Sequence, residues 1–319
     1  MENKKFKNKS ISKKCFICQG VFEYFLTHYD SYLKTSHKKY DIYKCMNCGL
    51  LKIFPEPTLE EIKTFYPKEY YSFNSTANSI FLEKIKDEIL RVHYKTKTKS
   101  LPMRLLAYIF INSISAVPLD YPKHNGKFLD IGCGDGYWLD KLEKYEWDCM
   151  GVEFIGKDTK KIRIGNFSEM DFKEKYEFIR ISHVLEHVVD PEKYLLKIKS
   201  LLDDGGECHI SLPNTDSVCC KIFGRYWFGL DIPRHIYSFS YKNLKVAIEK
   251  NGLKVKRVKY NSRGSFGSCM MNFFNILFNK NITDHFYIFT AASILIDKFF
   301  DMLRLGDSIT VIFEKKYVD

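Results

Sequence analysis

The sequence lacks an apolar run long enough to cross a bilayer. Its longest apolar stretches, 105–119 and 286–296, fall short of the ~20 residues that a spanning helix needs. The amino-terminal stretch has no uninterrupted apolar segment, which counts against a signal peptide. The ten cysteines do not form a secreted disulfide framework, because six of them are scattered through apolar or loop segments. We therefore expect a cytoplasmic protein, with peripheral contact at the inner face of the membrane as an open alternative.

Acidic residues are fewer than basic ones, 39 against 50, so the formal net charge is +11. A 45% apolar fraction over 319 residues is enough for a full hydrophobic core, and it excludes a largely disordered chain. Lysines solvated on every face explain the charge better than a dedicated groove for a polyanion. An anionic acceptor molecule or a nearby anionic membrane is the weaker inference.

Four cysteines form two C-x-x-C pairs, separated by 26 residues and followed by a glycine. Two close thiolate pairs satisfy tetrahedral Zn²⁺ coordination, and each pair is typical of a tight knuckle. The alternatives are a redox pair and chance pairing of reduced cysteines. Because all four positions are filled by protein, the predicted zinc is structural. Its ligands are Cys15, Cys18, Cys45 and Cys48.

The chain divides into three predicted parts. Residues 1–75 form the zinc ribbon and a linker, 76–120 form a helical bridge, and 121–319 form the main domain, with an apolar helical insert at about 268–305. From residue 127 onward, strand-like and helix-like segments alternate, which indicates a Rossmann-like α/β fold around a mainly parallel sheet. The expected strands are 127–132, 148–153, 162–165, 177–182, 207–212, 254–260 and 308–315, and the expected helices are 136–145, 191–202 and 241–250.

A glycine-rich loop follows the first strand of the main domain. Gly132, Gly134 and Gly136 allow a sharp turn and close approach of a ligand. Glu153 ends the next strand, 21 positions after Gly132, a spacing that suits a carboxylate holding a ribose diol. A dinucleotide site would need glycine where Tyr137 stands, so another nucleoside cofactor is expected.

These motifs together resemble a known family, and the resemblance covers nearly the whole chain. The chain is similar to bacterial class I S-adenosylmethionine (SAM) methyltransferases with an N-terminal zinc ribbon, many encoded with surface-polysaccharide or natural-product genes. They are relatives of the ubiquinone-pathway O-methyltransferases. The matching elements are the Cys-x-x-Cys-Gly and Pro-x-Pro of 45–57, the Leu-Asp-Ile-Gly-Cys-Gly of 129–134, the His-Val-Leu-Glu-His of 183–187, Pro213-Asn214, Pro233-Arg234-His235 and a shortened Leu305-Gly306-Asp307.

The resemblance implies a seven-stranded sheet whose last strand is antiparallel, with helices on both faces. It also implies that SAM binds at the glycine loop, with Glu153 on the ribose. The implied cofactor-binding residues are Asp130, Gly132, Gly134, Gly136, Glu153, Asn166 and Phe167. The chain departs from the family after Glu153, because a short loop at 155–161 replaces the usual helix.

Two histidine-bearing segments are the candidates for the chemistry, since methyl transfer to a hydroxyl needs an aligned acceptor and a proton acceptor. His183, Glu186 and His187 follow the fourth strand at the carboxyl end of the sheet, where ligands bind. Their spacing places them on one face of a helical turn. This face could supply a base, bind a divalent metal, or form a hydrogen-bonded turn without a ligand.

The second segment, 226–235, predicts a lid over the acceptor. In it, Trp227 is expected to stack on an acceptor ring and Arg234 to pair with a phosphate or carboxylate. His235 is the leading general base and His187 the second. Asn214 is a further expected acceptor contact. The alternative is a packed loop in which Arg234 pairs with an acid.

The function expected is SAM-dependent O-methylation of a sugar, glycan precursor or related small metabolite. N- or C-methylation of a sugar is the near alternative. A nucleic-acid methyltransferase is disfavoured, because 182–185 lacks the signature of base-amino methyltransferases, and a non-catalytic scaffold is the third class. The apolar insert predicts a core or dimer face, with a lipid-facing surface as the alternative. The acceptor and the oligomeric state stay open.

Overall fold

The computed structural model describes residues 10–31, 33–66, 126–262, 264–278 and 286–316, together with seven positions between 84 and 102. Its main sheet has seven strands in the order β11-β12-β9-β8-β5-β6-β7. All pairs from β9 to β7 are parallel, and β12 runs antiparallel to both β9 and β11. The strands are β5 (Lys127–Ile131), β6 (Asp148–Glu153), β7 (Ile162–Ile164), β8 (Tyr176–Ser182), β9 (Leu202–Pro213), β11 (Leu253–Tyr260) and β12 (Ser308–Lys315).

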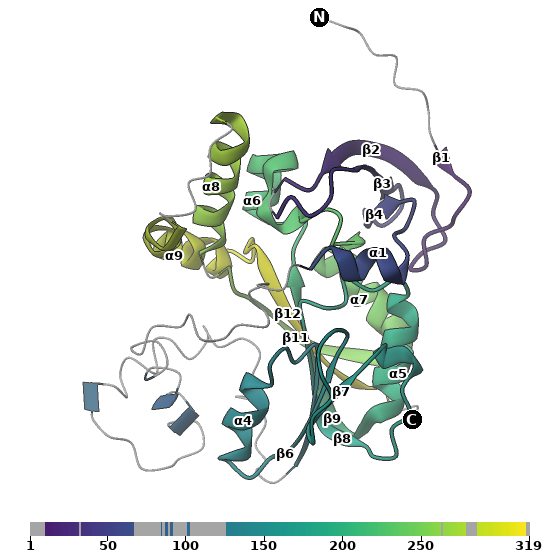
Figure 1. Ribbon diagram of the computed structural model, residues 1–319, viewed down its shortest axis with the longest axis vertical. Coiled ribbons are helices and arrows are strands. Elements are labelled where there is room, and N and C mark those ends of the chain that lie inside the picture. Colours follow the sequence, from purple (N-terminus) through teal and green to yellow (C-terminus); the bar gives the residue numbers. More distant parts are fainter. Residues whose placement is uncertain are drawn as a thin grey trace, which may run out of the picture.

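This arrangement confirms the expected Rossmann-like methyltransferase sheet with its last strand antiparallel. The central strands are apolar runs buried on both faces, as parallel sheets require. Helices α4 (Tyr137–Glu143), α5 (Pro191–Leu201) and α7 (Tyr241–Lys250) each present one apolar stripe to the sheet. Figure 1 shows α4 on one side of this sheet, and α5 and α7 on the other.

A second sheet is formed mainly by the cysteine-bearing N-terminal part. Its strand order is β1-β2-β3-β4-β10, all antiparallel. Helix α1 (Leu59–Thr64) follows, and Thr58 begins it with a capping box that satisfies two backbone N–H groups. The strands are β1 (Ser10–Ile11), β2 (Phe22–Tyr29), β3 (Lys39–Cys45), β4 (Leu51–Phe54) and β10 (Tyr237–Ser238).

The ribbon and the main domain are joined by a shared sheet and a shared hydrophobic core. Strand β10 belongs to the main domain by sequence, yet it pairs with β4, placing Tyr237 opposite Lys52. One continuous hydrophobic cluster also runs from the ribbon side chains into the main sheet. The Tyr237 N–H donates to the carbonyl of Glu186, so this junction lies at the carboxyl end of β8. The ribbon therefore borders the edge of the sheet at which ligands bind in such folds.

The predicted insert between β11 and β12 is helical. It contains α8 (Ser265–Phe278) and α9 (Phe286–Met302), which pack on each other beside α6 (Val218–Phe223) (Figure 1). Two short 3₁₀ turns, Gly224–Tyr226 and Phe228–Leu230, follow α6. Among the described residues, no helix combines the length and apolar character needed to span a membrane.

Most of the predicted helical bridge, 76–120, lies outside the described residues. The described positions within it, such as Glu88 and Leu90, are helical. The predicted boundaries at residues 75 and 120 stay predictions.

Candidate functional site

The glycine loop turns tightly between β5 and α4. Gly132, Gly134 and Gly136 have φ values of 77°, 58° and 85°, a region that other residues rarely adopt. A Cβ on Gly132 would lie 2.2 Å from Cγ2 of Val184, which follows β8. The loop is therefore held against the segment that carries the candidate histidines.

Glu153 lies where the expected ribose ligand should be. Its Oε2 accepts the N–H of Gly134 and its Oε1 accepts the N–H of Phe154, both at 2.8 Å. Burial raises the pKa of its carboxyl above the usual value, and the two backbone hydrogen bonds partly oppose this rise. A carboxylate has about four lone-pair sites, so two hydrogen bonds leave it able to accept a ribose diol. The remaining acceptor capacity of Glu153 and its position at the end of β6 fit the expected ribose contact.

Asp130 does not line an open surface, contrary to the expectation. It is fully buried in β5, and both its oxygens accept from Nη1 of Arg180 on β8, at 2.7 and 2.8 Å. This ion pair lies beneath the glycine loop, so Asp130 supports the loop. Arg180 was missed by the sequence analysis, although an arginine in the apolar run 178–181 beside a buried aspartate was a readable signal.

Asn166 and Phe167 begin the short 3₁₀ turn Phe167–Glu169 after β7. Asn166 Oδ1 caps this turn by accepting the N–H of Ser168, and it also accepts the Tyr194 hydroxyl at 3.3 Å. Phe167 is 1% exposed and packs on Tyr194. Phe167 is therefore a core residue. Asn166 is partly exposed at the position where the adenine is expected. No helix forms at 155–161, as the sequence predicts.

The two predicted histidine segments meet in space. The rings of His187 and His235 lie 4.6 Å apart, edge to face. Glu186, His187 and His235 each offer one ligand atom, and these atoms lie within 4.8 Å of one another. His183 stands at the rim, with a half-exposed side chain and its Nδ1 3.3 Å from Glu186 Oε1.

Hydrogen bonds fix the tautomers of the half-buried His187 ring and the buried His235 ring. His187 Nδ1 lies 3.0 Å from the carbonyl of Arg234, and His235 Nδ1 lies 2.8 Å from the carbonyl of Gly229. A carbonyl can only accept, so each Nδ1 carries the proton and each Nε2 keeps its lone pair. The Tyr66 hydroxyl, another contact that sequence reasoning missed, also lies 3.0 Å from His187 Nδ1.

Electrostatics keep Glu186 and His187 deprotonated at neutral pH. Burial and the charge of His235 lower the pKa of His187 to about 4. Burial alone would raise the pKa of Glu186, but the three neighbouring histidines outweigh it and lower that pKa to about 2. Glu186 is therefore an ion and His187 a neutral imidazole, a pair that can accept a proton or bind a cation.

Arg234 is not available to an acceptor, contrary to the expectation. It is 1% exposed, and its guanidinium donates to both carboxylate oxygens of Asp30 at 2.9 and 3.0 Å. It also binds Asp231, at 2.5 to 3.0 Å. The packed-loop alternative, in which Arg234 pairs with an acid, describes this arrangement.

The side chains of Trp227 and Asn214 are likewise buried and hydrogen-bonded to other parts of the protein. Trp227 is 1% exposed, and its indole N–H donates to Oδ1 of Asp307 at 2.6 Å. Asn214 is also 1% exposed, and its amide donates to the carbonyl of Gly306 at 2.9 Å. Both side chains hold the 3₁₀ turns and the start of β12 in place, so neither reaches an acceptor in this conformation.

The four ribbon cysteines converge. Sγ of Cys15 lies 3.6 Å from Sγ of Cys48, and Sγ of Cys18 lies 3.4 Å from Sγ of Cys45. Two equivalent knuckles position them, since the carbonyls of Cys15 and Cys45 each accept an N–H four residues later at 2.9 Å. All four sulfurs lie within 4.8 Å of one another.

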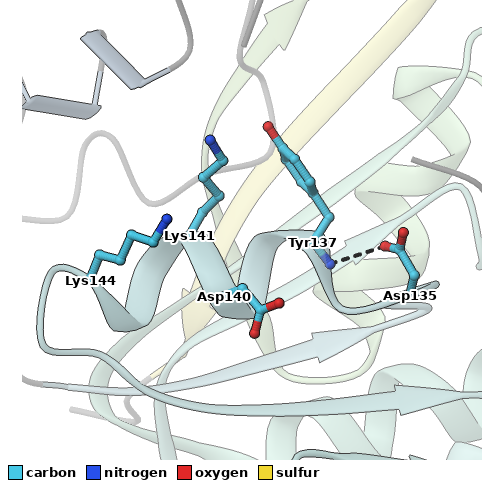
Figure 2. Close-up of a pocket in the computed structure, with 5 residues that line it drawn as sticks. All are labelled: Asp135, Tyr137, Asp140, Lys141 and Lys144. Atoms are coloured by element: carbon cyan, nitrogen blue, oxygen red, sulfur yellow. Dashed lines mark hydrogen bonds between the residues drawn. The ribbon is translucent and has the colours of Figure 1, made fainter. Parts of the chain in front are cut away.

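A shallow hollow on the outer side of α4 is separate from this site. It has a volume of about 170 Å³, below the ~300 Å³ at which small-molecule pockets begin. Figure 2 shows Lys141 and Lys144 projecting from the same side of the helix, with Asp135 accepting the N–H of Tyr137 at its start. We assign this hollow no function.

Comparison with known proteins agrees with the fold and the loop. A family model described as a methyltransferase domain matches residues 94–258. Ubiquinone biosynthesis O-methyltransferases of Cereibacter sphaeroides (strain ATCC 17025 / ATH 2.4.3) and Ruegeria sp. (strain TM1040) are 25% and 27% identical over 130 and 145 residues. These matches cover 36% and 38% of this chain. They cover 53% and 56% of the curated relatives, so the chain spans about half the length of those proteins.

Solved structures show weak similarity. A SAM-dependent methyltransferase from Mesorhizobium loti has a TM-score of 0.41 at 11% identity, covering 60% of this chain and 91% of its own. Coclaurine N-methyltransferase, bound to N-methylheliamine and S-adenosylhomocysteine, has a TM-score of 0.40 at 14% identity, covering 81% and 88%. The fold assignment therefore depends on the sheet topology given above.

The sheet order, the glycine loop and Glu153 define a class I SAM-dependent methyltransferase domain. Because the matching family model spans more than half of its 319 residues, the chain belongs to the methyltransferase-domain family.

Proposed function

We propose that the protein uses SAM to methylate a hydroxyl group of a sugar, a glycan precursor or a related small metabolite. One observation carries this proposal: two imidazoles, each bonded through Nδ1 to a backbone carbonyl, pack edge to face next to the segment that contacts the glycine loop. Val184 links the two parts, because it touches Gly132 and its carbonyl accepts the N–H of His187.

The methyl donor supplies an electrophilic carbon on a sulfonium sulfur, already activated for displacement. The chain would hold it with the glycine loop and with Glu153, whose remaining lone pairs face donors such as a ribose diol. Asn166 would border the base. What is left for the protein is to orient the acceptor hydroxyl and remove its proton.

His235 is the proposed general base, and His187 is the second candidate. The bond from Nδ1 to the carbonyl of Gly229 orients the His235 ring and leaves Nε2 to accept a proton. Glu186, buried and ionised, would stabilise the imidazolium that forms. His183 sits at the exposed rim, where it would contact the acceptor.

Structural zinc at the four cysteines is part of the proposal. Thiolates bound to zinc at ~2.3 Å lie about 3.8 Å apart in a tetrahedron, close to the 3.4 and 3.6 Å between sulfurs here. A metal with four thiolate ligands has no open position, so it would stabilise the ribbon and take no part in catalysis.

The choice of oxygen as the methylated atom is supported by the printed name of the curated relatives, which are O-methyltransferases. The choice of a sugar or glycan precursor comes from the sequence resemblance alone. N- or C-methylation would need the same cofactor and is an outcome that the assay below distinguishes.

The test is a screen of nucleotide sugars with methyl-labelled SAM, with the product located by mass spectrometry. With an active acceptor in hand, His235→Ala should lower turnover by about 10²- to 10⁴-fold, the usual contribution of a general base. SAM affinity, measured by calorimetry, should stay within about twofold of wild type, since the proposed cofactor contacts are the glycine loop and Glu153.

His37→Ala is the matched control, because His37 is an exposed ribbon histidine. If only His187→Ala slows turnover, the base assignment moves to His187. If neither variant slows it, the histidine mechanism is wrong. A labelled methyl group on a nitrogen or carbon atom of the product would replace O-methylation by N- or C-methylation.

A further inference from the structure

Glu186 presents an unusual feature for a buried carboxylate. Its residue exposure is 1%, and within the described part of the chain neither carboxylate oxygen has a hydrogen-bond donor in acceptable geometry. His183 Nδ1 approaches Oε1 to 3.3 Å but does not meet that geometry. Burying a charge without compensation is costly, and native proteins pair such groups or use them to coordinate metals.

Two imidazoles close to this carboxylate are suited to a metal. His187 and His235 each donate Nδ1–H to a backbone carbonyl, which leaves Nε2 as the ligand nitrogen. That outer hydrogen bond is the arrangement by which proteins orient metal-binding imidazoles. One ring nitrogen of each histidine and a carboxylate oxygen of Glu186 lie within 4.8 Å of one another. Ligands bound at ~2.1 Å sit about 3 to 4 Å apart, so the three side chains are already close to the spacing of a metal site.

We propose that Glu186, His187 and His235 bind a divalent transition-metal cation, distinct from the cysteine site of the ribbon. Two imidazoles and one carboxylate select a cation of the zinc, cobalt or manganese type, and three protein ligands leave positions open. A cation on Nε2 of His235 would take the lone pair that the proposed general base uses, so cation binding and the base role of His235 are alternatives. The inference goes beyond the proposed function, because cation binding can be measured without any methyl transfer.

A second buried cluster shows why this site is singled out. Cys219, Cys269 and Asp307 also lie within 4.8 Å of one another. However, Asp307 Oδ1 already accepts hydrogen bonds from Ser217 at 2.8 Å and from Trp227 at 2.6 Å. Donors within the protein compensate the charge of Asp307 but not that of Glu186, so of these two clusters the one with Glu186 is the better cation site.

The experiment titrates Co²⁺ into the full-length protein after a mild chelator has removed weakly held metal and the remaining zinc has been counted. Nitrogen and oxygen ligands give visible d–d bands without the thiolate-to-cobalt charge transfer that the cysteine site would give, so the spectrum separates the two sites. Wild type should bind one equivalent of Co²⁺ in addition to the ribbon metal. Glu186→Gln and His235→Gln should each weaken this binding by about 100-fold or more.

Glu249→Gln is the matched control, since Glu249 is an exposed glutamate that pairs with Lys245. It should bind Co²⁺ as wild type does. Wild type that takes up no cobalt outside the cysteine site, or Glu186→Gln that binds it unchanged, would overturn the proposal.

Thermal melting gives a second readout. In chelator, Glu186→Gln should melt no lower than wild type, because the substitution removes a buried carboxylate that lacks a donor. Added Co²⁺ or Zn²⁺ should raise the melting temperature of wild type more than that of Glu186→Gln. A lower melting temperature for the variant in chelator would mean that structural contacts already use the carboxylate, and would contradict the cation site.

Discussion

At the scale of single residues, close packing of the glycine loop decides what Gly132 can be. Gly132→Ala would add a Cβ 2.2 Å from Val184 Cγ2 at a φ of 77°. We expect a loss of about 1–3 kcal/mol in the free energy of unfolding, from overpacking and backbone strain together. Urea denaturation measures it.

The double variant Gly132→Ala/Val184→Ala separates the two causes. Removing the valine methyls should recover the packing part of the loss and leave about 1 kcal/mol of backbone strain. Strictly additive effects of the two substitutions would show that the loop does not rest on Val184.

Residue roles were the part of the site that the sequence could predict least. The place of Glu186 and His187 at the carboxyl end of the sheet follows from the motif after the fourth strand, whereas their meeting with His235 was not predicted. The buried contacts of Arg234 and Trp227 could not be predicted, because their partners Asp30 and Asp307 lie 204 and 80 positions away in the chain. A polar side chain in a loop looks the same in sequence whether it faces a ligand or a distant buried acid.

At the scale of elements, the Arg234–Asp30 pair ties the segment 226–235 to the ribbon. Asp30→Asn should destabilise the protein by about 3 kcal/mol at neutral pH, because it leaves part of a buried guanidinium unpaired. Urea denaturation of both proteins gives the difference, with Asp204→Asn as an exposed-aspartate control.

The pH dependence of that difference has a definite sign. Burial would raise the pKa of Asp30, but hydrogen bonds and charge from Arg234 lower it from 3.8 to about 2. A depressed carboxyl pKa contributes stability above the unfolded value, here about 2 kcal/mol, which is lost as pH falls through the folded value. The gap between wild type and Asp30→Asn should therefore narrow between about pH 4 and pH 2. A gap that is constant with pH would contradict the ion pair.

We expect zinc binding to stabilise the main domain as well as the ribbon. Cys48→Ser should lose the ribbon metal, whereas Cys220→Ser, which alters a cysteine outside the cluster, should keep about one zinc per chain. Because β10 pairs with β4, loss of zinc should lower the melting temperature of the main domain as well. Elemental analysis and calorimetric melting test this. A metal-free, fully folded wild type would refute the zinc assignment.

The strands that could be predicted are those whose apolar pattern lies within the strand itself. The seven predicted strands of the main sheet all form, because runs such as 127–131 and 176–182 are apolar on both faces. The two-residue strand β10 was not predicted, since its only partner is a ribbon strand about 185 positions earlier. Pairings of that range leave no periodicity in the sequence.

At the scale of the whole molecule, apolar side chains remain exposed on the helical insert. Leu295 and Met302 on α9 are 78% and 72% exposed, and Phe278 on α8 is 58% exposed. The expectation that this surface meets a second copy or a lipid surface stays a prediction. The net charge of +11 is likewise compatible with solvated lysines or with an anionic partner.

The central claim is that the glycine loop and Glu153 bind SAM although a loop replaces the helix at 155–161. Calorimetric titration of the purified protein with SAM and with S-adenosylhomocysteine tests it most directly. We predict micromolar binding of both, and about 10- to 100-fold weaker binding by Glu153→Ala, because hydrogen bonds to a charged group are lost. No binding of either compound by folded wild type would contradict the account and leave a methyltransferase fold without its cofactor.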